Sequence, residues 1–185
     1  MTATTGRQSR DVFQRPLNTA REGNWPNARV PVMVVMIDYH TDEPAHEIEP
    51  QDWLALIRLS EPRERLALRP GWRFLLELDI DRDGADGATV GMSLEQRQAI
   101  AKFWVRLTHE RLPLALVIRA DHDRTWSAAV ARVLGEAGSV YVPMPKIEYD
   151  RNAYQLLATE LRSALRAERR NSVLNRIRTV LGQSN

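Results

Sequence analysis

Four continuous apolar runs constrain the fold of this chain more than any other feature. They are PVMVVMI at residues 31–37, LALIRL at 54–59, FLLELDI at 74–80 and LALVI at 114–118. Each run is short and bounded by polar residues, Pro or Gly, as are strands buried on both faces of a parallel sheet. Because segments with helical periodicity follow the later runs, we predict an α/β fold. It has three layers, with a mostly parallel central sheet flanked by helices.

Three segments carry the helical pattern. Ser93 and Gln96 have the spacing of a capping box, which places a helix start at Ser93; its apolar face is formed by Ile100, Phe103, Trp104 and Leu107. A second helix is expected from Ala128 to Ala137, with Val130, Val133 and Leu134 facing inward. A third begins at the cap Asp150, and its apolar face is formed by Tyr154, Leu157, Ala158, Leu161 and Leu165. A short strand is expected at 139–142, between the second and third helices.

Length and composition exclude several classes of protein. The 185 residues suit one ordinary domain with appended ends. We expect an N-terminal arm at 1–29, an α/β domain at 30–168 and a basic amphipathic tail at 169–185. The chain has no cysteine, which excludes disulfides, thiolate zinc sites and a cysteine nucleophile. With no membrane-length apolar run and no signal-peptide-type segment, a cytoplasmic location is expected.

Charge is segregated along the chain. The formal net charge is only +2, yet residues 38–52 hold six acids and no Lys or Arg. Residues 162–178 hold six arginines and one glutamate. Segregation of acidic and basic residues along a sequence is more typical of proteins that bind a charged partner than an even mixture of the two is. A protein partner is therefore expected, and nucleic acid is a further possibility through Arg169, Arg170, Arg176 and Arg178.

The connection after the run LALVI is the first candidate site. In an open α/β sheet, ligands bind beyond the carboxyl ends of the strands, and a helix N-terminus favours anions there. The candidate residues are Arg119, Ala120, Asp121, His122, Asp123, Arg124, Thr125, Trp126 and Ser127. Trp126 is the one tryptophan that we expect to face a ligand or partner rather than the core.

This stretch, LALVIRADHDRTWSAAVARVLGEAG, resembles the phosphate-binding loop of bacterial dual-specificity, tyrosine-phosphatase-like proteins. Upstream, ALIRLSEPRERLALRPGWRFLLELDIDRDG resembles their strand, turn, strand and acidic loop. Downstream, YDRNAYQLL resembles their terminal helix. The resemblance covers about residues 53–165 and implies a tyrosine-phosphatase-like α/β fold.

The sequence departs from this family pattern at the positions whose residues carry out the family's chemistry. Ala120 stands at the position of the nucleophilic cysteine, and Trp126 at that of the phosphate-clamping arginine. Arg119 replaces the family histidine, and Asp123 replaces a glycine. Without a thiolate and a guanidinium clamp the family reaction has no means to proceed. The resemblance therefore implies a catalytically inactive, pseudophosphatase-like protein that acts as a binding or regulatory module.

Two alternatives remain open. The first is a metal-dependent hydrolase that reuses the old site through Asp79, Asp81, Asp121, His122 and Asp123. The second is a nucleic-acid-associated accessory protein that uses the arginine-rich C-terminus. The family pattern identifies Asp79 or Asp81 as the remnant of an acid loop.

No cofactor and no metal site is predicted. Residues 79–84 read D-x-D-x-D-G, the opening of a calcium loop, but Val90 occupies the position where such a loop needs its last carboxylate. A vestigial acid loop and plain turn chemistry are the other interpretations of this segment. His40 and His46 lie in the acidic segment without the spacing of a metal template.

The last segment of the sequence has an apolar stripe of its own. Val173, Ile177, Val180 and Leu181 fall on one side of a helix, and Arg176 and Arg178 fall off it. A basic amphipathic helix of this kind binds a membrane surface, an acidic groove of a partner or nucleic acid. The alternative is an ordinary terminal helix packed on its own domain.

Overall fold

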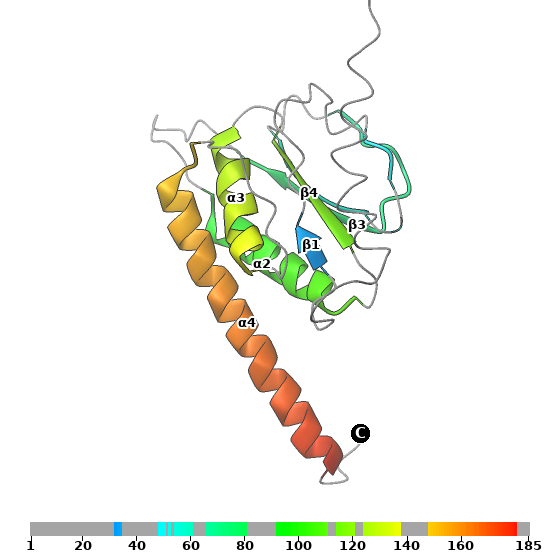
Figure 1. The fold of residues 1–185 in the computed structure, drawn as a ribbon, viewed down its shortest axis with the longest axis vertical. Coiled ribbons are helices and arrows are strands. Elements are labelled where there is room, and N and C mark those ends of the chain that lie inside the picture. Colours follow the sequence, from blue (N-terminus) through cyan, green and yellow to red (C-terminus); the bar gives the residue numbers. More distant parts are fainter. Residues whose placement is uncertain are drawn as a thin grey trace, which may run out of the picture.

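The structure is a computed structural model, and it describes residues 32–34, 48–50, 52, 54–60, 66–80, 92–110, 114–120, 124–137 and 148–180. These residues form, in chain order, β1 (Val32–Val34), β2 (Leu54–Ser60), β3 (Phe74–Asp79), α2 (Leu94–Thr108), β4 (Leu114–Ala120), α3 (Arg124–Ala137) and α4 (Arg151–Val180) (Figure 1). The N-terminal arm, most of the acidic segment and the strand expected at 139–142 lie outside the described residues.

The described strands form one parallel sheet in the order β1–β4–β2–β3. The predictions of an α/β fold and of a parallel sheet with β4 in its interior are confirmed. The expectation that the run at 74–80 is buried on both faces is wrong for the described sheet. β3 is its last strand, and the side chains of Leu75–Leu78 are only partly buried.

The two faces of the sheet have different neighbours. Ala55, Ile57 and Leu59 of β2 join one hydrophobic core with α2, α3 and α4. Because side chains alternate along a strand, Leu54, Leu56 and Arg58 point to the opposite face. All seven residues of β2 are buried, so both faces of this strand are covered.

α2 forms where the capping pattern predicted it. The Ser93 hydroxyl accepts a hydrogen bond from the Gln96 backbone N–H at 3.2 Å, and the Gln96 side chain accepts one from the Ser93 N–H at 2.7 Å. This reciprocal box satisfies two amides that the first turn leaves without partners. The predicted face is confirmed, since Ile100, Phe103, Trp104 and Leu107 are all buried.

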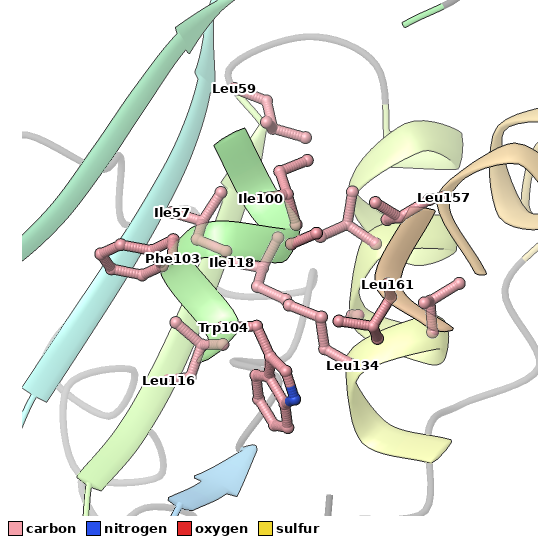
Figure 2. Close-up of a cluster of buried hydrophobic side chains, with 14 of the residues drawn as sticks. Ile57, Leu59, Ile100, Phe103, Trp104, Leu116, Ile118, Leu134, Leu157 and Leu161 are labelled. Atoms are coloured by element: carbon pink, nitrogen blue, oxygen red, sulfur yellow. The ribbon is translucent and has the colours of Figure 1, made fainter. Parts of the chain in front are cut away.

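α4 packs across α2 and α3 and completes the core. Asp150 caps it, accepting a hydrogen bond from the Ala153 N–H at 2.9 Å. Leu157 and Leu161 enter the core beside Leu134 of α3, while Ile57 and Ile118 line its sheet side (Figure 2). The predicted inward face of α4 is confirmed, with Tyr154, Ala158 and Leu165 packed at its margins.

The core makes a direct prediction for stability. Leu134→Ala removes a side chain with 0% exposure, so it should lower the free energy of unfolding by about 2–5 kcal/mol through lost burial and a cavity. Leu174→Ala, at 52% exposure on the same kind of element, should change it by less than about 0.5 kcal/mol. Urea unfolding followed by circular dichroism measures both. Equal losses for the two variants would contradict this description of the core.

Candidate functional site

The carboxyl ends of three parallel strands meet at one edge of the sheet. The register pairs Ser60 of β2 with Asp79 of β3, and Leu59 of β2 with Ala120 of β4. Among the described candidates, Asp79, Arg119 and Ala120 therefore lie along one sheet edge. This is the edge at which open α/β sheets bind ligands.

The connection from β4 to α3 is shorter than the sequence suggested. β4 continues through Arg119 to Ala120, and α3 begins at Arg124 rather than at Ala128. Most of the expected loop therefore belongs to the end of β4 or to the first turn of α3. Asp121, His122 and Asp123 stand between the two elements and lie outside the described residues, as does the side chain of Arg124.

The first turns of α3 face the core. Trp126, expected to face a ligand, is only 6% exposed and belongs to the hydrophobic core. That expectation is wrong because the earlier helix start turns this position inward. Ser127 is fully buried, and the Thr125 carbonyl accepts a hydrogen bond from the Asp150 N–H at 3.2 Å. These residues therefore anchor α3 and the start of α4 to the body.

A row of buried charge crosses the sheet close to this edge, and the sequence analysis missed it. The register places Arg58 of β2 beside Arg119 of β4 and beside Glu77 of β3. Arg58 is 1% exposed and Arg119 is 8% exposed. A signal was present in the sequence, because Arg58 and Glu77 interrupt the apolar runs at 54–59 and 74–80, and Arg119 directly follows the run at 114–118.

The contacts of Arg58 indicate a structural role. Its guanidinium lies 3.6 Å from the Glu77 carboxylate and donates a hydrogen bond to the Leu66 carbonyl at 2.5 Å. A buried guanidinium needs such partners, since an uncompensated charge in the interior is costly. Arg58 thus ties the segment after β2 to the sheet face opposite the described helices.

The acid-loop remnant is only partly described. Asp79 ends β3 with an exposed side chain, and its carbonyl accepts a hydrogen bond from the Gln96 side chain. Asp81 lies outside the described residues, together with the rest of the calcium-like segment. Within the described ranges, no group of three or more His, Asp or Glu side chains is placed to hold a metal ion.

A small polar cluster fixes the beginning of α4 against the end of α3. The Tyr154 hydroxyl donates a hydrogen bond to the Glu136 carboxylate at 2.5 Å, and Arg132 pairs with the same carboxylate at 3.2 Å. Arg132 also lies over the Tyr149 ring, 4.7 Å from its centroid. The hydrogen bond to Glu136 raises the pKa of Tyr154 above its ordinary value, because it favours the protonated phenol.

The arginine-rich segment belongs to α4. The helix runs without interruption from Arg151 to Val180, so the boundary expected between a domain ending at 168 and a tail beginning at 169 is no break in the secondary structure. Arg169, Arg170 and Arg176 are exposed; the side chain of Arg178 is not described. The described apolar side chains of this part, Val173, Leu174 and Ile177, are also exposed, so they do not pack on the domain in the way the alternative interpretation supposed.

In Figure 1 the C-terminal part of α4 extends past the body of the molecule. Its last described ion pair with the body joins Glu168 to His109 of α2, at 3.1 Å. Among the described helices none is long and apolar enough to cross a bilayer. No family model, curated protein or solved structure matches the chain.

Buried Arg58 and partly buried Glu77 should be energetically coupled. A double-mutant cycle with Arg58→Met and Glu77→Gln should give a coupling of about 1–3 kcal/mol, because replacing Glu77 removes a charged partner from a guanidinium that is screened from water. The exposed pair of Arg69 and Glu49, at 3.8 Å, supplies the control. Its cycle, with Arg69→Met and Glu49→Gln, should give about 0–0.5 kcal/mol. Urea unfolding of all variants provides the values, and equal couplings would contradict the structural role of Arg58.

Proposed function

We propose that this protein is a non-catalytic binding or regulatory module, of the pseudophosphatase-like kind, which attaches to a negatively charged partner through the projecting part of α4. The proposal has two parts. The first is that the edge of the sheet no longer performs phosphatase chemistry. The second is that α4 provides the binding surface. A cytoplasmic location belongs to the proposal and rests on the sequence.

The residues at the sheet edge support the first part. The chain contains no cysteine, and Ala120, at the nucleophile position, has no group that can attack phosphorus. Trp126, at the clamp position, is buried in the core. Of the five residues of the hydrolase alternative, the structure describes only Asp79, so that alternative remains a hypothesis from the sequence.

One observation carries the second part. Residues 166–180 hold five arginines and one glutamate, a net charge of +4, on a helix that extends past the body. Glu168 is paired with His109, whereas Arg166, Arg169, Arg170 and Arg176 form no ion pair within the part of the chain that the structure describes. A concentrated charge of one sign attracts an oppositely charged partner and raises its rate of encounter.

Several partners meet this charge requirement. The protein partner expected from the sequence does so, and so does nucleic acid, which the exposed arginines favour as a second candidate. The apolar side chains between the arginines favour a partner that also offers apolar contact. A steep loss of binding with salt, without dependence on Leu174 or Ile177, would identify the nucleic-acid alternative.

The purified protein should not hydrolyse p-nitrophenyl phosphate, with or without divalent metal ions. Loss of a nucleophile together with its partner groups removes several orders of magnitude in rate. The control for contamination is the Asp79→Asn variant purified in parallel. Turnover that survives repeated purification and that Asp79→Asn abolishes would contradict the non-catalytic proposal.

Deletion of residues 171–185 should leave a folded domain that has lost most of its partner binding at low salt. The described core contacts of α4 end near Leu165, so among the described residues the deletion removes charge and exposed apolar surface but no core residue. Binding is measured by capture from an extract of the native host at low and high ionic strength, where screening weakens the attraction. The proposal is wrong if the shortened chain binds its partners unchanged at every salt concentration. It is equally wrong if the shortened chain does not fold.

A further inference from the structure

α4 has one face that packs on the body and an opposite face that is exposed. Ala153, Leu157 and Leu161 are buried against the body and define its inner face. At 3.6 residues per turn, the opposite sector lies roughly 120–220° around the axis from Leu161. We call this sector the outer face; every one of its residues is exposed: Asn152, Gln155, Leu156, Thr159, Ser163, Arg166, Arg170, Val173, Leu174 and Ile177.

Apolar side chains gather at the far end of the outer face. Val173, Leu174 and Ile177 are 55%, 52% and 48% exposed, and their spacing makes them neighbours on the helix surface. Leu156, also exposed, is 18 residues before Leu174, which is five helical turns. Leu156 and Leu174 therefore lie on one line, about 27 Å apart along the axis. The outer face is thus exposed over almost the whole described length of the helix.

The charge of the outer face has a single sign. Arg166 and Arg170 lie on it, one or two turns before the apolar end, whereas Arg176 lies roughly 60° around the axis from Leu161, outside this sector. It carries no acidic residue, because Glu168 falls on the inner side and pairs there with His109. The whole outer face is therefore uncharged or basic, with apolar side chains at both ends.

The geometry and charge discriminate between occupants. The described residues of the chain's own body pack on the inner face of this helix and leave the outer face exposed. A second copy would bring together two segments of net charge +4, which repel each other. Nucleic acid would leave Val173, Leu174 and Ile177 without apolar contact. A flat surface contacts one sector of a helix along its full length, and the exposed outer face is such a sector.

On the basis of the proposed function, we propose that the negatively charged partner of α4 is the surface of an anionic lipid bilayer. The helix lies in the plane of the interface with its outer face toward the lipid. Val173, Leu174 and Ile177 enter the boundary between headgroups and acyl chains, and Arg166 and Arg170 lie at the level of the lipid phosphates. Because the body packs on the inner face, it stays on the water side of the helix.

The test uses the full chain and two kinds of vesicle. One consists of phosphatidylcholine alone, and the other contains roughly one third phosphatidylglycerol. Cosedimentation should show binding to the anionic vesicles only, and high salt should reduce it strongly, because the Debye length falls to about 3 Å at 1 M. The double variant R166Q/R170Q should bind the anionic vesicles about tenfold less or weaker still.

Matched variants separate the contributions. R151Q removes one exposed arginine at the start of α4, off the outer face, and should bind like the unaltered chain. L174Q/I177Q keeps every charge and removes apolar side chains, so it should also bind about tenfold less. S172Q adds the same polar group on the inner side of the helix and should have no effect. Circular dichroism and the unfolding midpoint should be the same for all variants, because each altered residue is exposed.

Four results would overturn the inference. If neutral vesicles bind as strongly as anionic ones, the arginines do not contribute to binding. If L174Q/I177Q binds as well as the unaltered chain, the apolar side chains at the end of the outer face do not contribute. A concentration-dependent dimer in sedimentation velocity that L174Q/I177Q abolishes would assign the outer face to a second copy. If vesicles do not bind but the deletion of 171–185 still abolishes capture of a host protein, the inference fails while the proposed function stands.

Discussion

Burial of β2 and β4 on both faces is the constraint on which the rest of the structure depends. A parallel sheet has no face that tolerates water, so each side of its interior strands must be covered. The residues of β2 meet this requirement completely, with Ile57 and Leu59 on the helix side and Leu56 and Arg58 on the other. The packing of α2, α3 and α4 on one face follows from it, and so does the tie from Arg58 to the Leu66 carbonyl on the other.

The same constraint shapes what the sheet edge is able to do. Because β4 extends to Ala120 and α3 begins at Arg124, few residues separate the strand from the helix. Trp126 and Ser127 are therefore buried in the interior rather than exposed at the end of the strands. The binding surface that we propose is instead on α4, whose inner face packs on the body and whose outer face is exposed.

Much of this organisation could be predicted from local signals. The reciprocal Ser93–Gln96 cap, the Asp150 cap and the inward faces of three helices depend on residues a few positions apart, and these predictions are confirmed. The start of α3 and the burial of Trp126 could not be predicted in this way. Both depend on how far the helix extends toward β4, which is decided by packing against the sheet.

The sequence by itself determined the fold class, because the period of its apolar residues fixes which segments become strands and which become helices. It also determined that no thiolate chemistry takes place, since the chain has no cysteine. Only the tertiary structure decided that Arg58, Glu77 and Arg119 stand in one row, because register between strands distant in sequence is set by burial across the sheet. It also decided that the apolar end of α4 faces outward, because the orientation of a helix follows the face that the core needs.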